Sequence, residues 1–322
     1  MQLIRVTEAA ALNASKYLGL GNKEMVDQAA VDAMRGMLEL VDVKGTVVIG
    51  EGEKDKAPML YIGERVGNWS EEAPEMDIAV DPIDGTRLVA NGLPNAIAVM
   101  AAAEKGKLAS LPTFYCEKLA CGPELKGKLD INASVRENLK IAAAVLRLDM
   151  NELTVVVLNR PRHEKLIEDI RKVGARIKLI SDGDIAAAIA SALPASGVNL
   201  YMGIGGSPEA VLAAAALKSL GGEIQVKLHP SEEEKNKIKE LDVDKVYLTE
   251  DLAGGENVVF AATGVTDGDL LKGVRYAKNH AITYTIAMRS KTHTIRKVEA
   301  FHDLKYKTIA LKSLGIDVKL DR

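Results

Sequence analysis

TVVVLNRPRHEKLIEDIRKVGARIKLISDGDIAAAIASAL, residues 154–193, is the stretch of the sequence that decides the fold class. It opens with a short apolar run, TVVVL, and continues into HEKLIEDIRKVG, where apolar residues recur at helical spacing and Gly174 provides an end. A second apolar run, RIKLIS, is followed by a second helical stretch, DIAAAIASAL. Strands that alternate with helices predict a parallel or mixed sheet with helices on its faces.

The same alternation continues toward the C-terminus and then changes. VNLYMGI and EIQVKL are predicted strands at residues 198–204 and 223–228, and PEAVLAAAALKSLGG between them is a predicted helix. From about Val258 onward, strands follow one another without helices between them, which is typical of antiparallel pairing. These predicted strands are VVFAATG, TYTIAMRS and TIRKVEAF, at residues 258–264, 283–290 and 294–301.

Two helices and three strands are predicted in the N-terminal part. Thr7 is a candidate N-cap for a helix that Gly19 or Gly21 ends, and Asn22 is a candidate N-cap for a second helix running to about Val41. The predicted strands are TVVIG, DIAVD and NAIAVMAAAE, at residues 46–50, 77–81 and 95–104. No element is predicted for the polar residues 122–138.

We therefore expect an α/β chain of two lobes. The first lobe is residues 1–153 and the second is residues 154–285, while residues 286–322 form C-terminal strands that can return to the first lobe.

Composition excludes several classes of protein. The 322 residues are 47% hydrophobic and 27% charged, which is enough for a substantial core. The net charge of −3 argues against proteins that bind nucleic acid or membrane surfaces through a basic excess. No apolar run is long enough to span a membrane, Glu8 interrupts any leader-like stretch, and two cysteines, Cys116 and Cys121, form no disulfide framework. We expect a reduced, soluble, cytoplasmic protein.

Acidic residues fall where burial is expected. At 100° per residue, Asp27 shares a helix face with Val31, Met34, Leu38 and Val41, all of which are apolar. A buried carboxylate needs a cation or several hydrogen bonds. The alternative is that Asp27 is half exposed and interacts with the positive end of the helix dipole.

Two further carboxylates, Glu51 and Glu53, directly follow the TVVIG strand with a glycine between them. Their spacing of two lets both face one cleft if the extended geometry continues. A solvated turn is the alternative. The stronger signal is Asp81-Pro82-Ile83-Asp84-Gly85-Thr86, in which two acids can reach around a tight turn to a hard cation such as Mg²⁺ or Mn²⁺. An Asp-Pro turn that caps a helix is the alternative here.

The run Gly203-Ile204-Gly205-Gly206-Ser207-Pro208-Glu209 ends another predicted strand. Ser207 can cap the following helix, Pro208 suits its first turn, and free N–H groups at a helix start bind anions. A nucleotide-binding regulatory module is the competing function, but its fingerprint needs a third glycine where Pro208 stands, and Glu223 opens the next strand instead of ending it. Glu209 can also be a plain helix-dipole partner.

Taken together, these acids stand at strand ends or helix starts, where an open α/β sheet places its ligand crevice. So many carboxylates in one place need counter-charge, and we therefore predict a divalent-metal site. Its candidate members are Asp27, Glu51, Glu53, Asp81, Asp84 and Glu209.

Beyond these physical arguments, the run at residues 81–86 resembles the metal-binding signature of the lithium-sensitive, metal-dependent sugar and inositol phosphatases. The wider combination resembles class II fructose-1,6-bisphosphatases across nearly the whole chain. The segments that carry it are RVTE (5–8), GTVVIGEGE (45–53), APMLYIGE (57–64) and GGSPE (205–209).

The resemblance implies a layered α-β-α-β-α sugar-phosphatase fold with the active site between two lobes. It implies hydrolysis of the 1-phosphate of fructose 1,6-bisphosphate in gluconeogenesis, with Mn²⁺ or Mg²⁺ as cofactor. The implied metal ligands are Asp27, Glu51, Asp81, Asp84 and Glu209. The implied substrate-binding residues are Asp84, Gly85, Thr86, Tyr115, Arg160, Pro161, Arg162, Asp182, Gly183, Asp184 and Gly206.

Chemistry gives several of these residues a role. Thr86 can orient the attacking water and pass a proton to Glu51 or Glu53, so these three are the predicted catalytic residues. Arg160 and Arg162, separated by a proline, offer planar guanidinium groups for the distal phosphate.

Four other residues near the predicted site have weaker assignments. Asp182 and Asp184 would accept hydrogen bonds from sugar hydroxyls, and Tyr115 could donate to a phosphate. His163 is expected only to support other residues.

Related substrates remain open: sedoheptulose 1,7-bisphosphate as a second substrate, and less plausibly an inositol monophosphate, which would not need the arginines. We expect a small sugar bisphosphate as ligand, no nucleic-acid or membrane partner, and a homo-oligomer.

Overall fold

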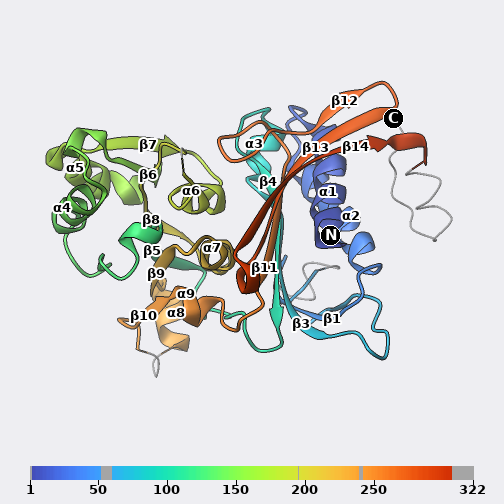
Figure 1. Cartoon of the computed structure of the whole chain (residues 1–322), viewed down its shortest axis with the longest axis horizontal. Coiled ribbons are helices and arrows are strands. Elements are labelled where there is room, and N and C mark those ends of the chain that lie inside the picture. The colour runs from blue at the N-terminus through green and yellow to red at the C-terminus, as the bar shows by residue number, and fades with distance from the viewer. Residues whose placement is uncertain (1, 52–59, 195, 239–241, 307–322) are drawn as a thin grey trace. The chain divides into compact units, whose positions relative to one another are not determined.

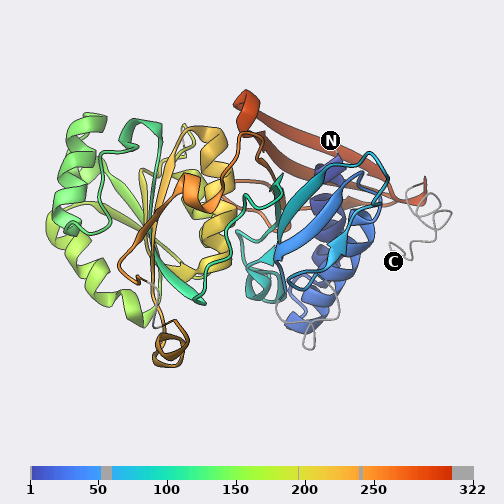
Figure 2. The same cartoon turned by 90° about the horizontal axis from the view of Figure 1, so that it is seen from below.

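The computed structural model describes residues 2–51, 60–194, 196–238 and 242–306, and it divides into two compact units. Unit 1 comprises residues 1–106, 259–289 and 294–322, and unit 2 comprises residues 107–258 and 290–293. Each unit has its own sheet with helices packed against it (Figures 1 and 2). The predicted α/β class is confirmed.

Unit 1 is built on a mixed eight-stranded sheet in the order β12-β13-β11-β4-β3-β1-β2, with β14 pairing with β13. Its elements are α1 Gln2–Ala14, α2 Lys23–Leu38, β1 Lys44–Ile49, β2 Arg65–Val66, β3 Glu75–Asp84, α3 Thr86–Ala90, β4 Ile97–Glu104, β11 Val259–Gly264, β12 Arg275–Ala277, β13 His280–Arg289 and β14 Thr294–Asp303.

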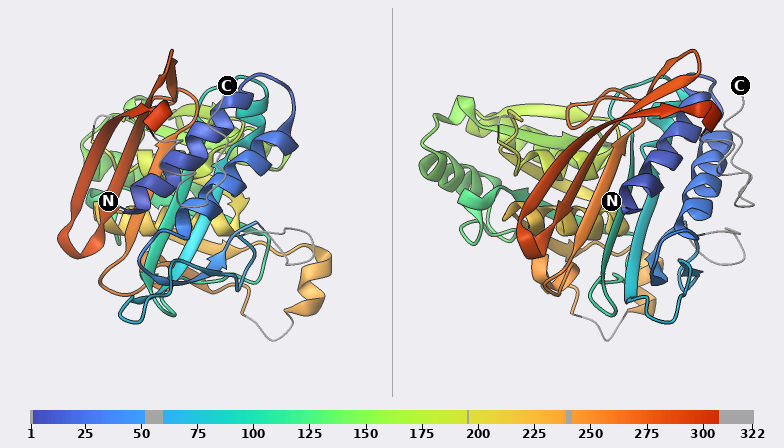
Figure 3. Two further views of the ribbon diagram at one scale, coloured as in Figure 1. Left: turned by 90° about the vertical axis from the view of Figure 1, so that its right-hand side faces the viewer. Right: turned by 45° about the vertical axis from the view of Figure 1, so that its right-hand side comes forward.

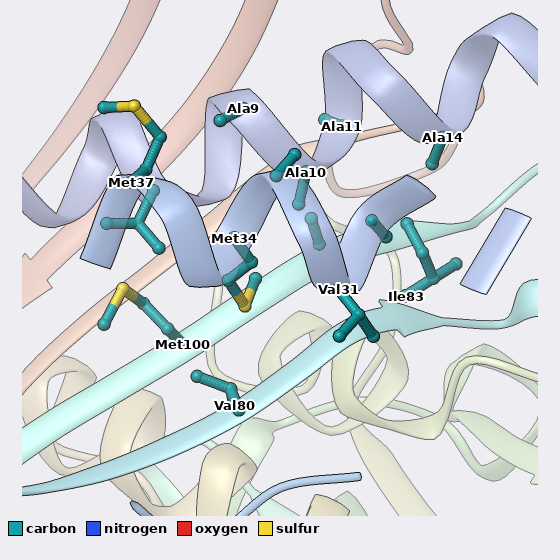
Figure 4. Packing of buried hydrophobic residues seen from close by; sticks show 14 of the residues in the cluster. Ala9, Ala10, Ala11, Ala14, Val31, Met34, Met37, Val80, Ile83 and Met100 are labelled. Carbon is teal, nitrogen blue, oxygen red and sulfur yellow. The ribbon is translucent and has the colours of Figure 1, made fainter. Parts of the chain in front are cut away.

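The core of unit 1 lies between the helix pair α1–α2 and the sheet (Figure 4). Small side chains such as Ala10 on α1 let the helices approach closely, while Met34 on α2 and Met100 on β4 fill the space between helix and strands. All three residues are fully buried. The predicted apolar face of α2 is confirmed.

The start of α1 differs from the prediction. The helix begins at Gln2, so Thr7 is an interior residue and not the N-cap. Its hydroxyl donates to the carbonyl of Ile4 at 3.1 Å and lies 2.8 Å from the hydroxyl of Thr263, which gives this fully buried group polar partners. Asn22 caps α2 as predicted, accepting a hydrogen bond from the Met25 N–H at 3.1 Å.

Unit 2 is built on a six-stranded sheet in the order β10-β9-β5-β8-β6-β7. Its elements are β5 Tyr115–Cys121, α4 Val135–Leu146, β6 Thr154–Leu158, α5 Glu164–Val173, β7 Arg176–Ile180, α6 Asp184–Ala190, β8 Leu200–Gly206, α7 Ser207–Leu220, β9 Glu223–Leu228, α8 Glu232–Lys237, β10 Val246–Leu248 and α9 Thr249–Leu252. Helices α4 and α5 pack together, as do α6 and α7 (Figure 2). The alternation predicted from residue 154 onward is confirmed.

The expected boundary at residue 153 falls inside unit 2. The reason is strand β5, which is hydrogen-bonded to both β8 and β9 and therefore belongs to the second sheet. Helix α4, which begins in the stretch 122–138 for which no element was predicted, packs against α5 of the same unit. At the other end, β11 and β13 join the sheet of unit 1, so the expected second lobe, residues 154–285, extends too far.

Candidate active site

In unit 1, strand β3 delivers Asp81 and Asp84 to a turn that begins helix α3. Gly85 occupies the turn with φ of +95°, a left-handed conformation that glycine adopts without strain. A Cβ here would also lie 2.7 Å from Leu88 Cδ1. Asp84 is buried and Asp81 is half-buried. The turn therefore fixes two carboxylates and the following hydroxyl within a few residues of chain.

The hydroxyl of Thr86 donates a hydrogen bond to Asp27 Oδ1 at 2.6 Å. It is also 3.3 Å from the carbonyl oxygen of Ile83. Asp27 is half-buried on α2, and burial raises the pKa of its carboxyl, against the lowering effects of the Thr86 hydroxyl and of Lys23. The acceptor for Thr86 is thus Asp27, where the sequence predicted Glu51 or Glu53. Glu53 lies outside the described residues.

Glu51 follows β1, the strand that pairs with β3. Strands β1 and β3 are parallel, with Ile49 opposite Ala79. Glu51 follows the last residue of β1 by two positions, Asp81 lies in β3 three residues before its end, and Glu51 is exposed. This is the edge of a sheet at which α/β proteins gather ligand-binding side chains.

In unit 2, the parallel strands β7, β6 and β8 lie side by side in that order. The chain passes from β6 to β7 on one side and then returns to β8 on the other, so the strand order reverses between β6 and β8. Such a switch point opens a crevice at the carboxyl ends of the strands. The predicted substrate residues at 160–162, 182–184 and 206 all follow these three strand ends or, for Gly206, complete one.

Each arginine of the basic turn has a defined partner. Arg160 Nη2 forms an ion pair with Asp182 Oδ1 at 2.7 Å. Arg162 donates from Nε and Nη2 to the carbonyl of Ile204 at 3.1 and 2.8 Å, and its guanidinium carbon lies 5.0 Å from the centroid of the Tyr115 ring. Cation–π stacking and a carbonyl acceptor therefore hold Arg162 against β8 and the start of β5.

Tyr115 and Gly206 are brought together by the sheet. They are paired residues of the antiparallel strands β5 and β8, and Tyr115 is 39% exposed. The Tyr115 ring is therefore accessible beside the glycines that precede α7. Within unit 2, the predicted residues Tyr115, Arg162 and Gly206 form one contiguous group.

Asp184 has a different environment from the one expected. Its Oδ2 atom accepts from Lys118 Nζ at 2.7 Å and from the Tyr201 hydroxyl at 3.1 Å, and all three side chains are buried. A Cβ on Gly205 would lie 2.0 Å from the same oxygen. This oxygen is therefore hydrogen-bonded within the protein interior, to Lys118 and Tyr201, whereas the sequence suggested a contact with sugar hydroxyls. Lys118 was missed, although a lysine inside the strand YCEKLAC is a visible signal.

Glu209 stands in the first turn of α7 beside this network. Its Oε2 atom is buried and has no hydrogen-bond partner among the described residues. Burial and the neighbouring Asp184 raise the pKa of the Glu209 carboxyl, although Lys118 opposes them. A Cβ on Gly206, the residue that caps α7 in place of the predicted Ser207, would lie 1.9 Å from Oε2. An unsatisfied carboxylate oxygen is a suitable ligand for a cation.

His163 joins the arginine turn to β8. Its ring is 1% exposed, with Nδ1 2.7 Å from the Leu158 carbonyl oxygen and Nε2 2.7 Å from the Ile204 N–H. An N–H can only donate, so Nε2 is the acceptor and Nδ1 carries the proton. Strands β6 and β8 pair directly at Val155–Leu200 and Val156–Tyr201, and the imidazole bridges them further along, where they separate.

Residues 1–302 match the family model described as bacterial fructose-1,6-bisphosphatase, glpX-encoded. The chain belongs to this family. It is 45% identical over 97% of its length to the D-fructose 1,6-bisphosphatase class 2/sedoheptulose 1,7-bisphosphatase of Thermosynechococcus vestitus (strain NIES-2133 / IAM M-273 / BP-1), covering 98% of that relative. A relative with the same name from Crocosphaera subtropica (strain ATCC 51142 / BH68) is 45% identical over 94% of this chain and 95% of its own. Family membership makes the protein a phosphatase, as the sequence predicted.

The carboxylates of this family member fit a hard divalent cation by their chemistry. All five predicted ligands are oxygen donors, which suit Mg²⁺ or Mn²⁺ better than Zn²⁺. Four of them belong to unit 1, and Glu209, with its unsatisfied oxygen, belongs to unit 2. In the described part of the chain, no three His, Cys, Asp or Glu side chains are grouped closely enough to hold a metal ion. The ligand set therefore stays a prediction.

No helix in the part of the chain that the structure describes is both long and apolar enough to span a membrane. The two cysteines are buried in unit 2, and burial raises the pKa of Cys116 to about 11 and that of Cys121 to about 12. Both are free thiols and, because of these raised pKa values, weakly reactive at neutral pH.

Proposed function

We propose that the protein hydrolyses the 1-phosphate of fructose 1,6-bisphosphate to give fructose 6-phosphate and phosphate, as a step of gluconeogenesis in the cytoplasm. The observation that carries this proposal is the match of residues 1–302 to the bacterial fructose-1,6-bisphosphatase family. Sedoheptulose 1,7-bisphosphate is proposed as a second substrate because the curated relatives carry both activities in their names. Both substrates have two phosphates, consistent with a second basic site at Arg160 and Arg162.

The attacking water would be positioned by Thr86. The hydroxyl proton of Thr86 is directed at Asp27 Oδ1, so the lone pairs of the Thr86 oxygen remain available to accept a hydrogen bond from water. Asp27 in turn is the nearest base to which a proton from that water can pass through the hydroxyl. We therefore propose Asp27 in place of Glu51 as the proton acceptor and keep Glu51 as a proposed metal ligand, while Glu53 lies outside the described residues.

The metal proposal concerns Mn²⁺ or Mg²⁺ held by Asp27, Glu51, Asp81, Asp84 and Glu209. Such an ion would polarise phosphoryl oxygens and lower the pKa of bound water. Its presence would also explain why a carboxylate oxygen of Glu209 is buried without a hydrogen-bond donor.

The distal phosphate is proposed to bind at the basic turn of unit 2. Arg162 uses Nε and Nη2 on the Ile204 carbonyl, which leaves Nη1 for a phosphate oxygen. The Tyr115 hydroxyl, on the ring below this guanidinium, is a second donor for the same phosphate. Asp182 neutralises part of the Arg160 charge, so Arg162 is expected to contribute more to binding.

The test is phosphate release from fructose 1,6-bisphosphate and sedoheptulose 1,7-bisphosphate by chelator-treated protein, before and after addition of Mn²⁺ or Mg²⁺. We expect metal-dependent turnover of fructose 1,6-bisphosphate and little release from an inositol monophosphate. Higher activity on the inositol monophosphate would contradict the substrate assignment. Tight binding of ATP or NAD without metal-dependent phosphatase activity would favour the nucleotide-binding alternative.

A further inference from the structure

Strand β14 forms an exposed edge of the sheet in unit 1. It pairs along its whole length with β13, from Thr294 opposite Arg289 to Asp303 opposite His280. Among the described residues, no other strand pairs with it. Figure 3 shows β14, in dark red, at the outer margin of the sheet. A ten-residue strand with one edge open is a template for pairing with another chain.

The side chains of β14 include exposed apolar residues, which are unusual on a sheet edge that is protected against pairing with other chains. Ile295 is 41% exposed and Phe301 is 71% exposed, and both lie on the same face of the strand with Lys297 and Glu299 between them. On the opposite face, His302 is buried, with Nε2 2.7 Å from the hydroxyl of Thr283, and Val298 and Ala300 are half-buried. Within unit 1, Glu299 is hydrogen-bonded to Tyr284 on β13, whereas the apolar side chains of Ile295 and Phe301 remain exposed on this face.

Geometry restricts how a second copy of β14 could pair with the first. In an antiparallel pair, alternate residues direct their N–H and C=O groups to opposite edges of the strand. Two identical edges can bond only where both opposed residues direct these groups outward, so the paired residue numbers must have an even sum. The two-fold axis then passes through a residue and not between two residues.

Side-chain charge selects among these registers. An axis at Lys297 places two lysines opposite each other, and an axis at Glu299 places two glutamates opposite each other, both of which are destabilising. An axis at Val298 places Lys297 opposite Glu299 of the second copy, twice over. It also places Ile295 opposite Phe301, an aliphatic–aromatic pair that covers the two exposed apolar side chains.

We propose that β14 pairs antiparallel with β14 of a second copy of this chain, with Val298 on the two-fold axis. The eight-stranded sheet of unit 1 is thereby continued across the interface into the sheet of its partner. Two ion pairs between residues 297 and 299 of the two copies set the register. The pairs of Ile295 with Phe301 at the two ends of the interface exclude water. The partner is a second copy because the charge pattern of this strand is complementary to itself.

Cysteine cross-linking tests the register. In Val298→Cys, the two new thiols would lie opposite each other on the axis, where paired strands hold Cα atoms about 4.5–5.5 Å apart, within the range for a disulfide. In the control Arg296→Cys, each residue faces Ala300, and the two thiols are about 13 Å apart along the strands. The native cysteines do not interfere because they are buried.

On mild oxidation of the full-length protein, we expect Val298→Cys to form a covalent dimer in non-reducing electrophoresis while Arg296→Cys and the unaltered protein do not. Equal cross-linking of both variants would exclude the register. An absence of cross-linking in Val298→Cys would overturn the interface itself. That result is also the one expected if another segment or another protein occupies this edge.

Charge reversal tests the same interface without new thiols. Lys297→Glu places four carboxylates across the axis. We expect it to lower the dimer association constant, measured by analytical ultracentrifugation, by at least tenfold. The double variant Lys297→Glu/Glu299→Lys restores opposite charges and should restore the dimer. Arg296→Glu changes the net charge equally but faces Ala300, so it should leave association nearly unchanged. If Lys297→Glu and Arg296→Glu behave alike, the proposed register is refuted.

Discussion

Removing the ammonium of Lys118 is expected to destabilise the protein strongly. Lys118 and Asp184 are 2% and 5% exposed, and the two charged atoms are 2.7 Å apart. Burial on its own lowers the pKa of Lys118, but the carboxylates of Asp184 and Glu209 outweigh it, so the net pKa is raised and the ammonium stays charged. Lys118→Met would leave Asp184 buried with the Tyr201 hydroxyl as its remaining side-chain donor.

The magnitude follows from the geometry. At 2.7 Å and an effective dielectric constant of about 20, the gross attraction of the pair is about 6 kcal/mol. The cost of taking both charges out of water offsets part of this attraction, and breaking a buried pair by removing one partner typically costs about 3–5 kcal/mol. For a unit the size of unit 2, this corresponds to a fall in melting temperature of about 6–20 °C.

The assay is thermal unfolding followed by circular dichroism in the presence of chelator. Fluorescence is less suitable because the single tryptophan, Trp69, lies in unit 1. Lys105→Met is the matched control, since Lys105 forms an ion pair with Glu75 at 2.6 Å but both side chains are exposed. This control should leave the melting temperature almost unchanged.

The double variant Lys118→Met/Asp184→Asn separates the charge effect from packing. It removes both charges while keeping an acceptor for Tyr201, so it should be more stable than Lys118→Met alone. Two results would refute the reasoning: a loss in Lys118→Met no larger than that in Lys105→Met, or a double variant no more stable than the single one.

Three other predictions concern the candidate site. Thr86→Ala is expected to lower kcat by about 10²–10⁴-fold with little change in KM because it removes the group that orients water. Thr86→Ser keeps the hydroxyl and should retain most activity. Equal losses of kcat in both variants would show that the role of Thr86 is structural. Glu209→Gln removes a buried negative charge, so it should raise the melting temperature of the chelator-treated protein. It should also reduce the rise in melting temperature that Mn²⁺ produces. An undiminished rise with Mn²⁺ would exclude Glu209 as a ligand. Burial lowers the pKa of His163, so its neutral form contributes stability above about pH 6.5, and this stability is lost as the pH falls through the lowered pKa. In His163→Gln, the free energy of unfolding should therefore depend less on pH between about pH 7 and 5. An unchanged slope of unfolding free energy against pH would contradict this prediction.

Sequence patterns predicted the parts of the fold that depend on local periodicity. The strands and helices from residue 154 to residue 228 follow from alternating apolar runs and helical spacing, and Asn22 was identified from its capping chemistry. Helix α4 was missed, although Ser134 and Glu137 form a capping box at its start. The boundary near residue 153 failed because the pairing of β5 with β8 and β9 joins segments far apart in sequence.

The candidate site was predictable in its residue types but not in its pairings. The placement of Asp27 on the apolar face of α2 was visible from helical periodicity. Its hydrogen bond with Thr86 was not, because it depends on how α2 packs over the start of α3. Likewise, Asp184 was expected to contact sugar hydroxyls, and only the fold of the sheet shows that Lys118 and Tyr201 donate to it.

The charges around α7 connect the stability of unit 2 with its proposed chemistry. One ammonium, Lys118, is buried near two carboxylates, and its close ion pair is with Asp184. The charge of Glu209 is therefore only partly compensated, and burial raises the pKa of its carboxyl. Had the network contained a second cation, Glu209 would be satisfied within the protein and would gain little from a metal. Because Lys118 neutralises Asp184 first, Glu209 is left with an under-compensated buried charge, and this is the physical basis for proposing it as a ligand of a divalent ion.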